Sequence, residues 1–233
     1  MKERIQKLIA ESGECSRRKA EELIIEGKVK VNGKTAKIGE TASREDKITI
    51  EGRTIKQERK LLVMLNKPKG IISTSEDEQG RKTVIDLVKI KERLYPVGRL
   101  DKDAEGLMLL TNDGSFANKI THPRYEIKKT YEVDLDKEIK EEDLDKINKG
   151  VIVEKRKVKA ETKKIKTRKA EIKIHEGRKH IVKKIFEELG YKVNNLKRTK
   201  IGNLSLGNLE KGKWRTISQT EIFLEIKKPR PAR

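Results

Sequence analysis

An apolar strand pattern preceded by three regularly spaced carboxylates is the feature that most constrains this chain. The stretch YPVGRLDKDAEGLMLLTNDG occupies residues 95–114. Asp101, Asp103 and Glu105 recur at every second position and lead into GLMLL, a run that is apolar on both faces of a strand. Such a strand belongs inside a sheet whose two faces are covered. The sequence therefore places charged side chains at the mouth of a buried sheet.

Carboxylates in that position have four chemical interpretations. They can cap backbone N–H groups, bind a metal, attack an electrophile or act as a base. Metal binding is weakly indicated, because no histidine is near in the sequence and the surroundings are strongly basic. Capping explains any one of the three acids, but it leaves Arg99 and the adjacent buried strand unexplained. From the residues alone, the nucleophile and base interpretations both stay open.

The charge of the chain indicates a polyanionic partner. The 233 residues include 58 Lys and Arg against 38 Asp and Glu, a formal net charge of +20. Residues 155–215 hold 21 basic and 6 acidic side chains, whereas residues 1–58 hold 14 and 11. A lysine-rich surface can also serve stability. A local excess this large more often neutralises phosphates, so we expect a nucleic acid partner.

Residue types that hold cofactors are scarce. Cys15 is the only cysteine, which excludes an intramolecular disulfide, and the chain has three histidines. No GxxxxGK[ST] or GxGxxG stretch is present, so we expect neither a metal nor a nucleotide cofactor. No run approaches the roughly 18 apolar residues of a membrane span, and the N-terminal segment is not a secretory signal. We expect a cytoplasmic monomer that does not contact membranes.

Hydrophobic spacing predicts an α+β protein in two parts. Two helices are expected first, one stopped at Ser12-Gly13 and one capped by Ser16, followed by a hairpin turning at Asn32-Gly33. The polar run 53–60 places a boundary near residue 58, giving domains at 1–58 and 59–233 with a basic tail at about 227–233. In the second part we expect strands at 61–68, 70–75, 106–111 and 128–135, three strands between 151 and 174, and helices at 83–88, 141–150 and 180–190.

The pattern of residues 2–53 resembles the S4 RNA-binding domain. A helix, the triplet SRR, a second helix and GKVKVNG follow one another in that order. A basic helix start offers backbone N–H groups and cations to phosphates. The plain alternative is a solvated helix whose arginines pair with Glu21 and Glu22. The resemblance implies RNA contacts at Arg4, Ser16, Arg17, Arg18, Lys19, Lys28, Lys30 and Asn32.

Five ordered blocks resemble the RsuA-like pseudouridine synthases, which modify ribosomal RNA. The blocks are LNKPKGIIST at 65–74, GRLDKDAEGLMLLTNDG at 98–114, KTYEV at 129–133, EGRKHIVKKIFEELGYKV at 176–193 and RTKIGNLSLGNLEKGKWRTIS at 198–218. The resemblance implies that Asp101 is the catalytic aspartate and Tyr131 the active-site tyrosine. It makes Lys183 the cation that favours the ionised aspartate. Further RNA contacts are implied at Lys67, Arg99, Arg178, Lys179, His180 and Lys184.

The resemblance implies isomerisation of a flipped-out uridine to pseudouridine in ribosomal RNA or a pre-ribosomal particle. It implies a mostly antiparallel mixed sheet flanked by helices, behind a small S4 domain. Ala104 stands where a small hydroxyl residue is usual, Ile181 where glutamine is usual, and lysines stand at 183 and 184 where arginine is common. The alternative function is a non-catalytic RNA-binding ribosome-assembly factor on the same scaffold. The presence of Asp101 favours the enzyme.

Overall fold

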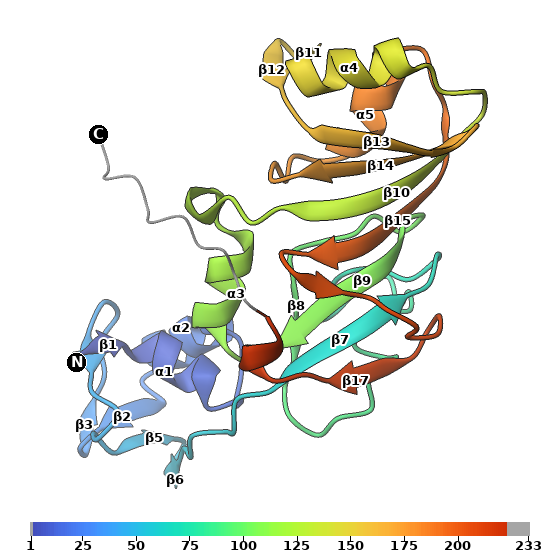
Figure 1. The fold of residues 1–233 in the computed structure, drawn as a ribbon. Helices are drawn as coiled ribbons and strands as arrows, with labels where there is room; N and C mark the ends of the chain where they lie inside the picture. The colour runs from blue at the N-terminus through green and yellow to red at the C-terminus, as the bar shows by residue number, and fades with distance from the viewer. Residues whose placement is uncertain (1, 223–233) are drawn as a thin grey trace. The chain divides into compact units, whose positions relative to one another are not determined.

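The computed structural model describes residues 2–222 of the chain, which form two compact units (Figure 1). The first unit contains the residues up to Leu61 together with Ile90–Leu94 and Asn112–Gly114. The second unit contains the rest of the described chain. The basic tail expected at about 227–233 lies outside the described residues.

Two short helices and two small sheets make the first unit. Its elements are β1 Glu3–Arg4, α1 Ile5–Glu11, α2 Arg17–Ile25, β2 Val29–Val31, β3 Lys34–Thr35, β4 Thr41–Ala42, β5 Ile48–Ile50 and β6 Arg53–Thr54. Strands β1 and β4 pair, and the other four form an antiparallel sheet in the order β3-β2-β5-β6. The predicted cap is confirmed, because the Ser16 hydroxyl accepts a hydrogen bond from the Lys19 backbone N–H at 3.2 Å. Ile5, Ile9 and Val29 are buried in the core of this unit.

A nine-stranded sheet forms the centre of the second unit. Its main path runs β13-β14-β10-β15-β9-β7-β17, from top to bottom of Figure 1, with β8 paired to β9 and β16 to β15. The strands are β7 Leu62–Lys67, β8 Tyr95–Val97, β9 Glu105–Thr111, β10 Lys129–Leu135, β13 Glu161–Lys166, β14 Lys169–Ile174, β15 Val193–Ile201, β16 Leu204–Ser205 and β17 Trp214–Thr216. Every pairing is antiparallel except that of β9 with β15, so the predicted mostly antiparallel mixed sheet is confirmed.

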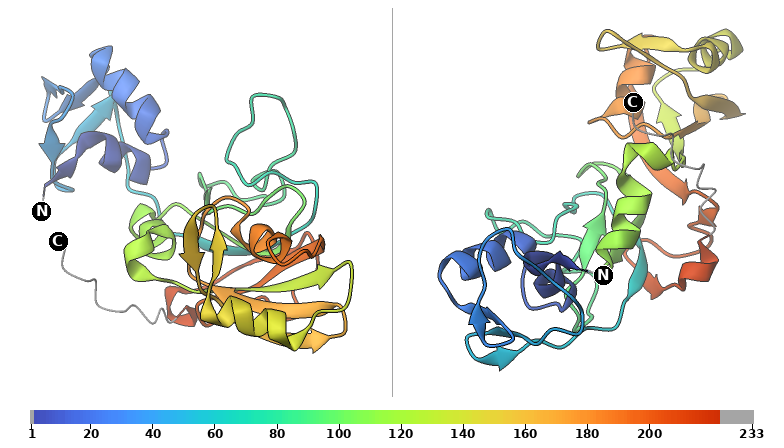
Figure 2. Two further views of the ribbon diagram at one scale, coloured as in Figure 1. Left: turned by 90° about the horizontal axis from the view of Figure 1, so that it is seen from above. Right: turned by 90° about the vertical axis from the view of Figure 1, so that its left-hand side faces the viewer.

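Three helices accompany this sheet, and a separate hairpin joins β11 to β12. The bounds are α3 Gly114–Thr121, η1 Pro123–Tyr125, α4 Glu141–Lys149, β11 Val151–Val153, β12 Arg156–Val158, α5 Ile181–Glu187 and η2 Gln219–Glu221. Strands β7 and β9 are buried along their whole length, and α3 packs Phe116 and Ile120 into the same apolar cluster. The connection from β7 to β8 projects away from the sheet in the left view of Figure 2.

The parallel contact between β9 and β15 requires a glycine. Gly106 faces Arg198 across the two strands and has a φ of +104°. A Cβ atom at this position would lie 2.2 Å from the Arg198 carbonyl oxygen. Only a residue without a side chain permits this approach. The glycine therefore sets the distance between the strand that follows Asp101 and the strand that carries Arg198.

Several sequence expectations are wrong in detail. Residues 70–75 form no strand and make only an isolated bridge from Ile72 to Thr83. Residues 83–88 form no helix, because the Asp86 carboxylate accepts bonds from the N–H and hydroxyl of Thr83 and stabilises a turn instead. Four strands, not three, lie between 151 and 174, and α3 follows the Asp-Gly turn where no helix was expected.

Candidate active site

Asp101 lies in the loop between β8 and β9. The backbone N–H of Ala104 donates to the Asp101 carbonyl at 3.1 Å, which closes a turn. The Ser73 hydroxyl donates to the Leu100 carbonyl at 2.7 Å and accepts from the Leu100 N–H at 3.2 Å. The side chain of Asp101 is 27% exposed. The backbone of this loop is therefore fixed while its carboxylate stays accessible.

Lys67 anchors the same loop from inside the sheet. Its Nζ atom donates to the carbonyls of Pro68 at 3.2 Å, Asp101 at 3.0 Å and Ala104 at 2.8 Å, which uses all three donors of the ammonium. Burial lowers the pKa of Lys67 to about 8, although the charges of Asp101 and Asp103 partly oppose this. The side chain has no exposed surface. The expectation that Lys67 contacts RNA therefore needs correction, since the lysine holds the backbone of Asp101.

The basic side chain in contact with the Asp101 carboxylate is a histidine. The Nε2 atom of His180 lies 3.2 Å from Oδ1 of Asp101. His180 is the residue before α5 and has a φ of +58°, a left-handed conformation that is uncommon for a side chain of this size. Strained residues of this kind concentrate at functional sites. The structure thus directs an imidazole at the predicted catalytic carboxylate.

Lys183 does not take the position expected for it. Its ammonium pairs with the carboxylate of Asp103 instead of that of Asp101. The hydrogen bond from Lys183 lowers the pKa of Asp103, although partial burial opposes the shift. Lys184, which was expected to contact RNA, pairs with Glu154. The start of α5 explains why Lys183 does not contact Asp101. The helix begins at Ile181, so His180 immediately precedes it and contacts Asp101, while Lys183 lies further along the helix and contacts Asp103.

A cavity of about 360 Å³ lies beside the carboxylate of Asp101. We call it the Asp101 cavity. Its wall includes a half-buried Tyr131 from β10. Six of the predicted site residues line it, namely Arg99, Asp101, Tyr131, Arg178, Lys179 and His180. Lys183 and Lys184 do not line it. The structure therefore brings together residues from the loop before β9, from β10 and from the segment that precedes α5.

A second, wider depression borders the other side of Asp101. It has a volume of about 880 Å³ and is bounded by the loop Lys69–Arg81, in which Arg81 pairs with Asp77. Arg99, Lys179 and His180 border this depression as well as the Asp101 cavity. All three of these basic side chains are exposed. A phosphate backbone that follows the depression would meet cations next to the cavity mouth.

The predicted RNA-binding residues of the first unit differ in whether they already have partners within the protein. Lys19 pairs with Glu22, Lys28 pairs with Glu26 and Glu51, and Asn32 donates to Asp46. Arg4 donates to the Gly39 carbonyl at 2.9 Å. Lys30 is exposed on β2.

Arg17 and Arg18 are exposed at the start of α2 and form no ion pair within residues 2–222. The alternative in which they pair with Glu21 and Glu22 is therefore absent from the described chain. Glu21 instead accepts from Gln6, and Glu22 binds Lys19. These exposed arginines are therefore available to a phosphate.

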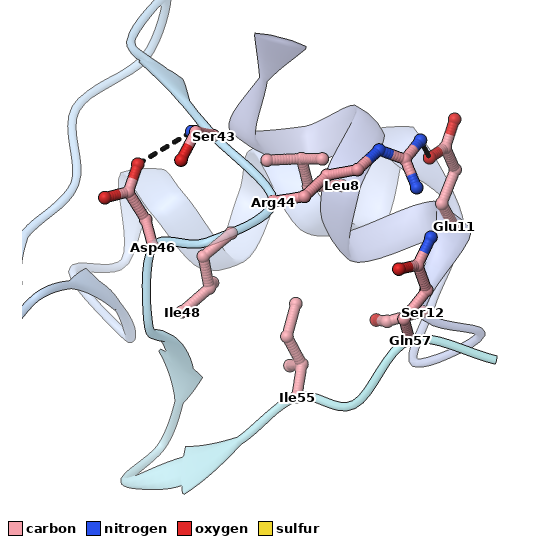
Figure 3. A pocket seen from close by; sticks show the side chains of 9 residues that line it. All are labelled: Leu8, Glu11, Ser12, Ser43, Arg44, Asp46, Ile48, Ile55 and Gln57. Atoms are coloured by element: carbon pink, nitrogen blue, oxygen red, sulfur yellow. Dashed lines mark hydrogen bonds and ion pairs between the residues drawn. The ribbon is translucent and has the colours of Figure 1, made fainter. Parts of the chain in front are cut away.

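A small pocket in the first unit is a separate feature (Figure 3). It has a volume of about 80 Å³ and lies between Leu8, Ile48 and Ile55. Arg44 pairs with Glu11 across it. None of the predicted RNA-binding residues lines this pocket, so it is not the predicted RNA surface.

Sequence reasoning missed two side chains of the site and one contact. His180 was expected to contact RNA, and its approach to Asp101 was not anticipated. Lys129 and Arg198 also line the Asp101 cavity. A signal for Lys129 was present, because residues two apart on a strand share a face and Tyr131 follows it by two. Arg198 carries no such signal, since its place depends on the parallel pairing of β15 with β9.

Neither a metal-ligand cluster nor a membrane-spanning helix occurs in residues 2–222. No three His, Cys, Asp or Glu side chains of this range gather in a way that could hold a metal ion. In the same residues, no helix has the length and apolar character needed to span a membrane.

The sequence matches two known families in the order that the fold suggests. Residues 61–188 match the RNA pseudouridylate synthase family, and residues 3–48 match the S4 domain. The chain therefore belongs to the RNA pseudouridine synthases, the enzymes that isomerise uridine within RNA. With an S4 domain ahead of the catalytic domain, it is a member of the RsuA-like branch of that family.

Individual relatives cover nearly the whole chain. The chain is 44% identical over 229 residues to the ribosomal large subunit pseudouridine synthase B of Bacillus subtilis, covering 94% of each chain. It is 38% identical to the dual-specificity RNA pseudouridine synthase RluF of Escherichia coli, covering 94% of this chain and 77% of the relative. The crystal structure of a pseudouridylate synthase matches with a TM-score of 0.69 at 34% identity, covering 94% and 97% of the two chains.

Proposed function

We propose that this enzyme converts a specific uridine of ribosomal RNA to pseudouridine and that Asp101 is its essential carboxylate. The observation that carries the proposal is the place of Asp101, whose carboxylate borders the Asp101 cavity together with Tyr131. The fixed backbone on both sides of Asp101 supports it, since a reacting group must be held in position. The names of the relatives support ribosomal RNA as the substrate.

The reaction requires no external group. The N-glycosidic bond breaks, the uracil turns, and a carbon–carbon bond forms to the same ribose. Asp101 acts in its ionised form, whether on the sugar, on the base or on a ribose proton. Tyr131 lies beside the flipped uracil and offers its ring for stacking. Arg99, Lys179 and His180, exposed at the mouth, bind the RNA backbone and hold the nucleotide extruded.

The S4 domain supplies affinity for structured RNA. We place it at residues 1–58 and the catalytic domain at 59–233. The basic helix start of the first unit binds phosphates of the same RNA, which is ribosomal RNA or a pre-ribosomal particle. The enzyme works as a monomer in the cytoplasm, where that substrate is found.

The test compares Asp101→Asn with the wild-type enzyme. Asparagine keeps the size of the side chain and removes the charge, so we expect folding and RNA affinity to persist while pseudouridine formation stops. Asp103→Asn is the matched control and should retain activity. Both assays run in EDTA without nucleotide, because no cofactor is expected. A wild-type rate for Asp101→Asn would refute the role of the carboxylate.

The substrate is tested by mapping pseudouridines in ribosomal RNA from cells with and without the protein. One site lost on deletion, restored by the wild-type gene and left unmodified by Asp101→Asn, is the expected result. If Asp101→Asn instead corrects every defect of the deletion strain, the alternative of a non-catalytic assembly factor is favoured.

A further inference from the structure

Three cations of the central sheet lie near Asp101, and two of them line the Asp101 cavity. They are Lys67 on β7, Lys129 on β10 and Arg198 on β15. Lys67 donates hydrogen bonds to three backbone carbonyls, so all the donors of its ammonium are satisfied within the protein. The other two line the cavity and are not satisfied in this way. This difference separates a structural lysine from a candidate ligand site.

Arg198 is a buried cation without a carboxylate partner. Arg198 is only 3% exposed. The Nε atom donates to the Leu107 carbonyl at 2.7 Å, and Nη2 approaches the Met108 sulfur at 3.8 Å. Within residues 2–222 it forms no ion pair. A guanidinium has five donors, and leaving such a charge unpaired in the interior is costly.

Lys129 lines the same cavity as Arg198 and has almost as few hydrogen-bond partners within residues 2–222. Its Nζ atom makes one long hydrogen bond, 3.5 Å, to the Ile120 carbonyl at the end of α3. Burial and, to a lesser extent, the charge of Arg198 together lower the pKa of Lys129 to about 8. Lys129 precedes Tyr131 by two residues on β10, so both side chains face the cavity.

A purely structural explanation is available for each residue. Lys129 could serve only to cap α3, and Arg198 only to brace β9. Neither role needs two adjacent positive charges, which repel one another and carry the cost of desolvation. A methionine or leucine would fill the same space without that cost. The pair is explained if negative charge arrives between them during the reaction.

We propose that Lys129 and Arg198 bind the carbonyl oxygens of the target uracil and stabilise the negative charge that the base carries while it is detached from the ribose. This inference rests on the proposed function of the Asp101 site. When the N1–C1′ bond breaks, its electron pair remains on the base and is shared by N1, O2 and O4. After the base turns, C5 bonds to C1′, the proton on C5 leaves, and N1 takes up a proton. Fixed donors aimed at this charge lower the barrier.

The depth at which each cation lies determines whether it can meet the base or the phosphates of the RNA. Arg99, Lys179 and His180 are exposed at the mouth, where an RNA backbone can pass. Arg198 lies at the inner end and is nearly inaccessible. A flipped base enters a pocket ahead of its ribose while the phosphates stay outside. The inner cations therefore meet uracil oxygens and the outer cations meet phosphates.

The first arm of the test uses free bases and does not depend on which RNA is the substrate. Uracil, 5-fluorouracil and inorganic phosphate are titrated against the full-length wild type, Lys129→Met and the matched control Lys128→Met. Lys128 is the next residue, but its side chain is 42% exposed and pairs with Glu161. Fluorine makes the base a stronger acid, so 5-fluorouracil should bind the wild type more tightly than uracil does.

We expect Lys129→Met to weaken the binding of 5-fluorouracil by about tenfold or more. The variant should also bind 5-fluorouracil no more tightly than uracil. Lys128→Met should bind both bases as the wild type does. Equal base affinities for wild type and Lys129→Met, or no base binding by the wild type, would overturn the inference. A loss confined to phosphate would overturn it too, because the pair would then bind a phosphate.

The second arm measures single-turnover conversion of a ribosomal RNA transcript. Lys129→Met should lower the rate at saturating enzyme by about tenfold or more without a matching loss of RNA affinity, and Lys129→Arg should restore part of it. An unchanged rate would contradict the inference. If the wild type binds bases through Lys129 but leaves every ribosomal RNA unconverted, the proposed substrate fails while this inference stands.

Discussion

The imidazole Nε2 of His180 lies 3.2 Å from Oδ1 of Asp101, while Lys183 pairs with Asp103 two residues along the same loop. Two side-by-side contacts therefore join the β8–β9 loop to the start of α5. The group beside the predicted catalytic carboxylate is therefore an imidazole, and the ammonium of Lys183 binds the carboxylate two residues further along. This arrangement determines which substitutions should affect the reaction and which should affect only the loop.

Replacement of His180 by asparagine should slow the reaction. Asparagine accepts the left-handed backbone at φ +58°, so the fold is kept, but its shorter side chain cannot place an N–H where Nε2 of His180 lies. We expect the single-turnover rate to fall about tenfold, the size of a lost hydrogen bond to a charged group. His175→Asn, at an exposed histidine outside the cavity, is the control. Equal rates for all three proteins would show that the contact is incidental.

Lys183 and Asp103 should behave as a coupled pair. Lys183 is 18% exposed and Asp103 is 68% exposed, and removal of the lysine leaves the negative charge of Asp103 uncompensated two residues from Asp101. We expect Lys183→Met to cost about tenfold in rate and Asp103→Asn less than about threefold. The double variant should be no slower than Lys183→Met alone. Fully additive losses would mean that Lys183 acts on Asp101 or on RNA independently of Asp103.

Lys67→Met should destabilise the enzyme more than substitutions of the exposed cations at the cavity mouth. Methionine fills the space but leaves the carbonyls of Pro68, Asp101 and Ala104 without their donor. The expected loss is about 3 kcal/mol of unfolding free energy, measured by urea denaturation. Arg99→Met, at an exposed position, is the control and should leave stability unchanged within about 0.5 kcal/mol.

The same lysine gives the stability a pH dependence of defined sign. Its folded-state pKa is about 8, below the usual 10.5 of lysine, so between these values the unfolded chain binds the proton and the folded chain does not. The contribution of Lys67 to the free energy of unfolding should therefore increase as the pH rises from 8 toward 10.5. Thermal melts of the wild type and Lys67→Met across this window should diverge. A constant difference in melting temperature would contradict the lowered pKa.

The parts of the fold that could be predicted are those where the local pattern and the burial agree. The apolar run of β9 and the alternation of β10 specify strands, and Ser16 specifies the start of α2. The segment Gly70–Lys89 could not be predicted, because its turn depends on the side-chain contact between Asp86 and Thr83. The apolar residues suggested a strand at 70–75 and a helix at 83–88.

For the site, the sequence indicated the carboxylate but not its surroundings. Asp101 was singled out by the resemblance of its GRLD segment to the family motif, since the position before a buried strand is shared with Asp103 and Glu105. The burial of Lys67 was not, because lysine is ordinarily a surface residue and its three acceptors are backbone carbonyls, which any sequence provides. The pairing of His180 with Asp101 joins residues far apart in sequence, and no periodicity reports on such contacts.

The exposed arginines of α2 should control how strongly RNA binding depends on salt. Arg17 and Arg18 form no ion pair within residues 2–222, whereas Lys19 in the same turn is paired with Glu22. Each phosphate contact removed lowers the slope of log affinity against log salt concentration by about 0.9 for a duplex. In the full-length enzyme, Arg17→Ala with Arg18→Ala should therefore make the slope shallower by about 2. Binding to a ribosomal RNA transcript between low and physiological salt measures this slope.

The control for this experiment is Arg53→Ala on β6, an exposed arginine of the same unit that was not expected to touch RNA. It should leave the slope unchanged. The double variant should also convert bound RNA at the wild-type saturating rate, because phosphate contacts of the first unit supply affinity and leave the Asp101 cavity intact. A lowered saturating rate with an unchanged slope would contradict the division of labour between the S4 domain and the catalytic domain.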